Sequence, residues 1–175
     1  MSAEAAFRSL FAAAYADVVR YVARRTTDDP EDIAAEAFAV VWRRWSDVPR
    51  EPDAARAYAF GVARRILLAQ QGRSSRRAAL SVRLAGESAH VGSAEEMVVP
   101  SVTVQQAWAQ LEADQQEVLA LAMLDGLPSA AAGRVLGISA GAYRIRLSRA
   151  RAALAALVET EPPPVPIPVV AKGRF

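Results

Sequence analysis

Cysteine is absent from this sequence, and histidine occurs only once, at His90. Without cysteine the chain can form neither disulfides nor thiolate metal sites, and its composition is compatible with a reducing compartment. One histidine and no glycine-rich phosphate loop leave little from which to build an active site. We therefore expect a binding protein that is not an enzyme, with no catalytic residues and no cofactor.

Long apolar runs and alternating β-branched segments are also missing. No apolar run of about 18 residues is free of charge, so no membrane span is expected. The first ten residues, MSAEAAFRSL, lack the basic-then-apolar pattern of a secretion signal. Hydrophobic residues make up 53% of the chain, and much of that share is alanine, which favours helix. We expect an all-α protein of the cytoplasm.

Acidic residues are missing from two long stretches that are rich in arginine. The stretch Ala54–Gly86 contains seven arginines, and the stretch between Asp125 and Glu159 contains five. Two basic surfaces in one chain are typical of two contacts with one polyanion, although two unrelated solvated faces are the alternative. Acids gather instead around residues 28–36. Helix capping and a solvated or partner-facing surface explain that cluster better than a divalent cation, so no metal site is expected.

The stretch from Leu127 to Leu157 predicts two helices joined by a tight turn. Ser129 is the expected N-cap of the first helix, Gly137 the left-handed residue that ends it, and Ser139 the N-cap of the second. The apolar residues of the second helix fall on one side of it: Tyr143, Leu147, Ala150, Leu154 and Leu157. With arginines around that stripe, this pattern predicts a DNA-binding helix-turn-helix. A solvated helix in an ordinary bundle is the alternative.

Three more helices are predicted before this motif, at residues 3–25, 30–45 and 54–71, from apolar residues that recur every three or four positions. Asp29 and Asp53 are the expected N-caps of the last two of these helices.

Residues 73–100 lose the helical period and are rich in small residues, which predicts a flexible linker. The helical pattern returns at residue 101 and ends at Gly126. The tail, residues 160–175, contains five prolines and cannot continue a helix.

The order of these pieces resembles the extracytoplasmic-function group of bacterial sigma factors. Three motifs carry the resemblance: DPEDIAAEAFAVVWRRW at Asp29–Trp45, RAYAFGVARRILL at Arg56–Leu68, and the stretch Leu111–Leu154, which includes LGIS and RLSRAR. The chain departs from the family pattern at several positions. One of them is Gly133, where the family usually has alanine.

The resemblance implies two small helical domains joined by the linker 73–100: region two at residues 1–72, and region four, with the helix-turn-helix, at residues 101–159. It implies a sigma factor, which binds core RNA polymerase and directs promoter-specific transcription initiation. The implied partners are core polymerase and promoter DNA, and an anti-sigma factor is a further candidate. The proline-rich tail, residues 160–175, lies outside the shared pattern.

The resemblance also assigns candidate site residues. The −35 element is expected to meet the second helix of the helix-turn-helix, through Arg144, Ile145, Arg146, Ser148 and Arg149. The −10 element is expected to meet Trp45, Arg56, Tyr58, Arg64 and Arg65. The polymerase contacts are expected at Asp32, Glu36, Trp42 and Arg43, with Trp42 turned toward the core.

Two other functions remain open from the sequence. A helix-turn-helix regulator would bind DNA without polymerase, usually as a dimer on a palindrome. A sigma-like interaction protein would contact no DNA at all. An in vitro transcription assay with purified core polymerase would distinguish these three functions.

Overall fold

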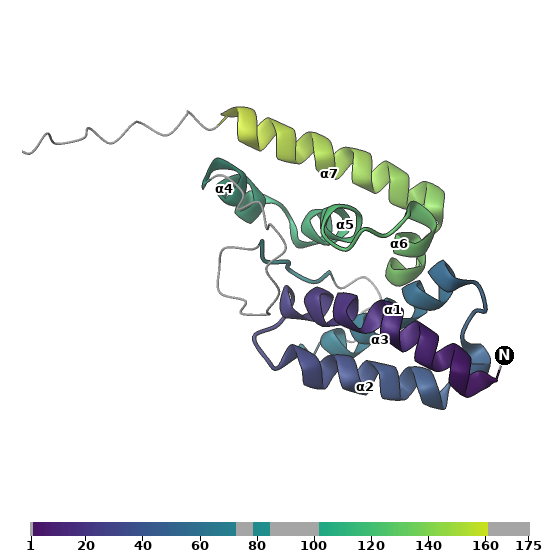
Figure 1. Ribbon diagram of the computed structural model, residues 1–175. Helices are drawn as coiled ribbons and strands as arrows, with labels where there is room; N and C mark the ends of the chain where they lie inside the picture. Colours follow the sequence, from purple (N-terminus) through teal and green to yellow (C-terminus); the bar gives the residue numbers. More distant parts are fainter. Residues whose placement is uncertain (1, 73–78, 85–101, 161–175) are drawn as a thin grey trace, which may run out of the picture.

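The structure is a computed structural model of the 175-residue chain, and it describes residues 2–72, 79–84 and 102–160. These residues form seven α-helices and one short 3-10 turn, Trp45–Asp47, and they contain no strand (Figure 1). The predicted all-α fold is therefore confirmed. His90 and, apart from Thr160, the predicted proline-rich tail lie outside the described residues.

Region two consists of α1 (Ala3–Ala23), α2 (Pro30–Arg43) and α3 (Pro52–Gln70), which pack against one another in pairs. Asp29 caps α2 as predicted, because its side chain accepts a hydrogen bond from the N–H of Glu31. The predicted cap of α3 is wrong by two residues. Pro52 supplies the first helical residue, so the carboxylate of Glu51 accepts the N–H groups of the first turn instead.

Region four consists of α4 (Val102–Gln110), α5 (Ala113–Met123), α6 (Ser129–Leu136) and α7 (Ala140–Thr160). The helical stretch predicted from residue 101 is interrupted after α4, where the Gln115 side chain accepts the N–H of Glu112 and starts a new helix. The last helix, α7, contacts α4, α5 and α6 (Figure 1).

The helix-turn-helix consists of α6, its turn and α7. Gly137 is left-handed with φ 70°, and the Ser139 hydroxyl accepts the N–H of Ala142 at 3.1 Å, so both predictions are confirmed. Ser129 is not the cap of α6, because Pro128 occupies the cap position and Ser129 is already helical.

Gly133 lies in the middle of α6, buried under the turn that leads to α7. A Cβ atom at this position would lie 2.8 Å from the carbonyl oxygen of Ile138. The backbone of the turn therefore comes closer to α6 than an ordinary side chain allows. The lower helix propensity of glycine is offset here by this close approach.

Replacing Gly133 by valine is expected to lower the free energy of unfolding by about 1–3 kcal/mol, because the added carbons must push the turn away from α6. Chemical denaturation followed by circular dichroism measures the change. The matched control is Gly61→Val in α3, where a Cβ atom meets nothing within 4 Å. Equal stability of the two variants would contradict this role for Gly133.

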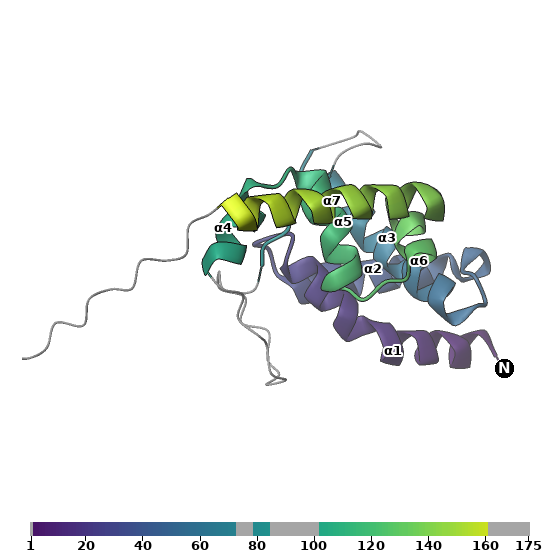
Figure 2. The same cartoon turned by 90° about the horizontal axis from the view of Figure 1, so that it is seen from above.

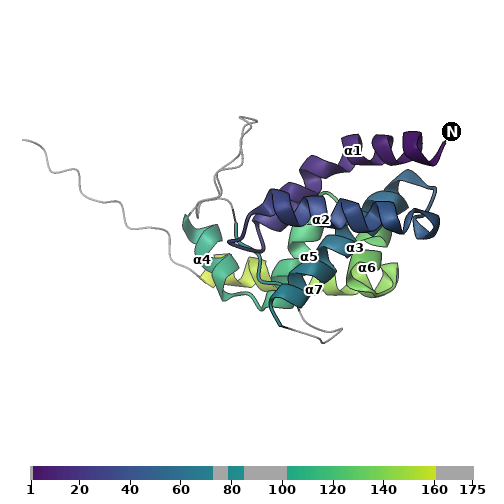
Figure 3. The ribbon, with the colours of Figure 1, turned by 90° about the horizontal axis from the view of Figure 1, so that it is seen from below.

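The two regions pack directly on each other through α3 and α6. Figure 2 shows α7 lying across α5, and Figure 3 shows α2 on the opposite face of the molecule. Helices α7 and α2 thus lie on opposite sides of the molecule.

Residues 79–84, in the middle of the predicted linker, are non-helical and lie between the two regions. Val82 is buried; its N–H donates to the Gln116 side chain, and its carbonyl accepts the indole N–H of Trp108 at 2.7 Å. The N–H of Arg83 donates to the carbonyl of Arg24 at the end of α1. This part of the linker is therefore fixed to both regions rather than flexible. The rest of the linker lies outside the described residues.

Candidate nucleic-acid interface

The outward face of α7 carries every residue that the sequence assigned to the −35 element. The side chains Arg144, Ile145, Arg146, Ser148 and Arg149 are all exposed. The opposite face, with Tyr143, Leu147 and Ala150, is buried against the rest of region four as predicted. Because no acid occurs between Asp125 and Glu159, every charged side chain on this face is cationic. Such a surface attracts phosphates and presents guanidinium groups to base edges.

Tyr143 fixes α7 on its scaffold. Its ring is fully buried, and its hydroxyl donates a hydrogen bond to the carbonyl of Val118 in α5 at 2.7 Å. Burial raises the pKa of Tyr143 to about 12, so the hydroxyl remains a donor at neutral pH. The arginine face is therefore presented by a helix whose rotation is fixed by the core.

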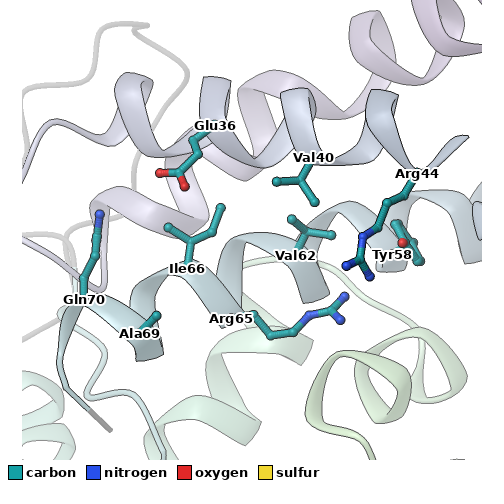
Figure 4. Close-up of a pocket in the computed structure, with 9 residues that line it drawn as sticks. All are labelled: Glu36, Val40, Arg44, Tyr58, Val62, Arg65, Ile66, Ala69 and Gln70. Carbon is teal, nitrogen blue, oxygen red and sulfur yellow. The ribbon is translucent and has the colours of Figure 1, made fainter. Parts of the chain in front are cut away.

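The five residues assigned to the −10 element do not form one surface. Tyr58 and Arg65 of α3 share a pocket of about 480 Å³ between α2 and α3 (Figure 4). Arg44 enters the same pocket from the end of α2, and Glu36 lies at its rim. Tyr58 is half-buried, whereas Arg65 is exposed and donates to the carbonyl of Gly61 at 3.1 Å. One aromatic ring, two cations and the carboxylate of Glu36 thus line an open pocket.

Arg56 and Arg64 lie on the other side of α3, where region two meets region four. Arg56 contacts the carboxylate of Asp17 at 2.8 Å and donates to the carbonyl of Asp125 at 3.0 Å. Arg64 is buried and makes a bidentate ion pair with Glu117 of α5. Its Nε lies 2.7 Å from Oε1 of Glu117, and its Nη2 lies 3.1 Å from Oε2. Burial alone lowers the pKa of Arg64, but the hydrogen bond and charge of Glu117 raise it more, so the net shift is upward. Both arginines are engaged by protein carboxylates in this closed arrangement.

Sequence reasoning missed the carboxylates of Glu117 and Asp125. Glu117 is only 2% exposed, and it lies within the run of α5 residues that continues with Val118 and Leu119. An acid next to such an apolar run is the only signal that marks it in the sequence. Asp125 carries no such signal, because it stands in a turn beside Gly126.

Trp45 and Trp42 belong to a cluster of aromatic rings at one end of region two. The Phe7 ring lies 5.0 Å from Trp42 and 5.6 Å from Trp45, measured between ring centroids. Trp42 was expected to face the core, but it is 46% exposed, although its ring contacts Phe7 of α1. Other members are Phe11, Tyr15 and Phe38.

The acidic start of α2 borders this aromatic cluster. Asp32, Glu36 and Arg43, the remaining residues assigned to polymerase, are all exposed on α2. Burial raises the pKa of Tyr15, and the negative charges of Glu31, Asp29 and Asp32 raise it further. The carboxylates at the start of α2 therefore lie close to Tyr15, one ring of this cluster.

The described residues contain no cluster of three or more metal-ligating side chains. In the same ranges, no helix combines the length and the apolar character that crossing a bilayer requires.

Two family models match the chain, in the same order as the two structural regions. The model "Sigma-70 region 2" matches residues 11–77, and the model "Sigma-70, region 4" matches residues 101–154. No curated protein matches the chain.

Two solved structures share the fold. CnrH, in complex with the cytosolic domain of CnrY, is 24% identical with a TM-score of 0.56, and the match covers 89% of each chain. The sigma factor RpoE from Bartonella quintana, in complex with the anti-sigma factor NepR, is 21% identical with a TM-score of 0.53. That match covers 90% of this chain and 94% of that chain.

Proposed function

Because this chain belongs to the sigma-70 family, we infer that it acts as a sigma factor of the extracytoplasmic-function type. It binds core RNA polymerase and directs transcription initiation at promoters. The observation that carries this function is the presence of both sigma regions in order, with the arginine face of α7 exposed. The protein performs no reaction of its own, and its place of action is that of the polymerase, the cytoplasm.

The exposed face of α7 is assigned to the −35 element. The second helix of a helix-turn-helix enters the major groove with its N-terminal half. Arg149 lies near the middle of the exposed face, where a guanidinium reaches the O6 and N7 acceptors of guanine. Arg144 and Arg146 lie nearer the flanks and suit phosphates. Ile145 is 57% exposed and has the right character to contact a thymine methyl group, while Ser148 suits either a base or a phosphate.

The pocket between α2 and α3 is assigned to the −10 element. Melting DNA needs a place for unstacked bases and cations for their phosphates. Tyr58 offers the ring, and Arg44 and Arg65 offer the cations, all within one open pocket. Arg56 and Arg64 can contact the −10 element only when region four moves away from α3, because both bind residues of region four. Trp45 lies in the aromatic cluster and does not line this pocket, so it is not placed beside Tyr58.

The exposed surface of α2 is assigned to polymerase. Asp32, Glu36 and Arg43 supply charged contacts that steer the encounter, and the half-exposed ring of Trp42 supplies an apolar anchor. The same surface suits an anti-sigma factor, which would then compete with polymerase.

Reconstituted transcription tests this function. Purified protein mixed with core polymerase should yield specific transcripts from a library of promoter fragments, whereas core polymerase alone should yield none. A shift of double-stranded DNA without polymerase, and no transcripts with it, would favour a helix-turn-helix regulator. Absence of both activities would favour a sigma-like interaction protein.

A further inference from the structure

The aromatic cluster of region two exposes part of its rings on the surface. Tyr15 stacks on Phe11 with a centroid distance of 4.6 Å, and both rings contact Phe38 of α2. Phe11 is 38% exposed, although it is a large apolar side chain. Exposed apolar residues that contact one another mark an interaction surface, whereas single ones are ordinary. This end of the cluster, formed by Tyr15 and Phe11, is therefore open to a partner.

Carboxylates border this open end. Glu31 lies seven positions before Phe38, so the two residues share one side of α2. Burial raises the pKa of Tyr15, and the charge of Glu31 raises it further, which places that carboxylate near the ring. Asp28, Glu31 and Asp32 are all exposed, and none of them makes an ion pair with another described residue. The surface therefore combines exposed rings with carboxylates that can accept a cation.

One segment of the chain has the complementary composition. Residues 169–175, VVAKGRF, contain three large apolar side chains, two cations and no acid. Valine and phenylalanine side chains are stabilised when they cover exposed rings, because both surfaces leave water. Lys172 and Arg174 can pair with carboxylates, and a guanidinium or ammonium group also binds the face of an aromatic ring. The segment thus matches the surface in apolar character and in charge.

The end of α7 lies where this segment can reach region two. Helix α7 ends at Thr160, at the same end of the molecule as the turn between α1 and α2 (Figures 1 and 2). Residues 161–168, EPPPVPIP, separate Thr160 from the segment, and proline-rich spacers extend by about 3.1 Å per residue. They can therefore span about 25 Å, whereas a compact chain of this length is roughly 40 Å across. The segment can contact the start of α2 without any movement of the helices.

We propose that residues 169–175 dock on region two of the same chain. Their apolar side chains cover the rings of Tyr15 and Phe11, and their cations pair with the carboxylates at the start of α2. The proline-rich residues 161–168 act as the spacer that carries the segment there. Because α2 is also the surface assigned to polymerase, the docked segment competes with polymerase. The competition rests on the proposed function, whereas the docking does not.

Nuclear magnetic resonance of the full chain tests the docking. Because the chain has no cysteine, Ala171→Cys places a single nitroxide label within the segment. The label should broaden the amide signals of Tyr15 in α1 and of Glu31 in α2. The amide signal of Arg144, near the other end of α7, should stay sharp.

Charge reversal tests the predicted ion pairs in the labelled chain. Lys172→Glu with Arg174→Glu should abolish the broadening, and so should Asp28→Lys with Glu31→Lys. All four substitutions together place opposite charges against each other again and should restore it. The matched control, Lys172→Arg with Arg174→Lys, keeps both cations and should leave the broadening unchanged. Asp28 and Glu31 are exposed, and circular dichroism confirms that each variant keeps its helix content.

Affinity for core polymerase gives the second readout. A segment that leaves α2 free for only about one tenth of the time weakens the apparent affinity about tenfold. The full chain with Lys172→Gln and Arg174→Gln, which removes the cations without adding acids, should therefore bind core polymerase up to about tenfold more tightly. The Lys172→Arg, Arg174→Lys control should bind like the unchanged chain.

Sharp signals of Tyr15 and Glu31 in the labelled chain would overturn the docking, and so would broadening that survives both charge reversals. In a mixture, broadening of isotope-labelled chains by nitroxide on other chains would assign the segment to a second copy and overturn the contact within one chain. Docking without any gain in polymerase affinity in the glutamine variant would overturn the competition. A failure of every form to bind polymerase would reject the sigma function and leave the resonance result to decide the docking.

Discussion

Core polymerase is expected to bind at least tenfold more weakly when Asp32 and Glu36 are both replaced by lysine. Both side chains are exposed in the first half of α2, so the substitution leaves the core untouched. Charges across an interface are complementary, so reversing these two charges sets them against the partner surface, and a tenfold loss corresponds to about 1.4 kcal/mol. Burial raises the pKa of Tyr15, and Glu31, Asp29 and Asp32 raise it further, so the start of α2 brings several negative charges together.

Fluorescence anisotropy of labelled protein titrated with core polymerase measures this change at two salt concentrations. The matched control is Asp114→Lys with Glu159→Lys, which makes the same change of charge on exposed positions of region four. The weakening should be larger at low salt, because screening reduces charge effects between exposed groups. An unchanged dissociation constant in the Asp32 and Glu36 variant would remove α2 from the polymerase interface.

Loss of Arg149 should flatten the base preference at a single position of the −35 element. Loss of a bidentate hydrogen bond to guanine costs about 1–3 kcal/mol of binding free energy at that base pair. Arg144→Ala should instead weaken binding to all sequences alike and reduce the salt dependence, as expected for a phosphate contact. Both residues are exposed on α7, so neither substitution removes a core side chain.

Selection from promoters randomised across the −35 element, with reconstituted polymerase, reads out the preference of each variant. Arg134→Ala serves as the control, since it removes an exposed arginine of α6 that has no assigned role in base recognition. If Arg149→Ala selects the same sequences as the unchanged protein, the base contact lies elsewhere on α7.

The features that the sequence predicted correctly are those set by near neighbours in the chain. The spacing of Tyr143, Leu147 and Ala150 defines the buried side of α7, and Gly137 and Ser139 define its start, all within one short stretch. Such patterns depend only on helix geometry and on the hydrogen bonds of the helix ends.

The features that the sequence missed depend on partners far away in the chain. Arg64 has the composition of a DNA contact, yet Glu117, which lies 53 residues further on, binds it. The helical spacing of Phe60, Arg64 and Leu67 places Arg64 on the buried face of α3, but it does not reveal the acid that pairs with it. Trp42 was misplaced for a related reason, since the ring that it contacts, Phe7, lies in another helix.

The segment 79–84 also determines where region four can be cut from the chain. The matched region-four domain begins at residue 101, but the indole N–H of Trp108 and the side chain of Gln116 find their partners in Val82. A fragment that starts at residue 101 would expose these buried polar groups and the apolar surface that Leu80 and Val82 cover. An isolated region four that is meant for nuclear magnetic resonance or DNA selection should therefore start at residue 79 and retain this segment.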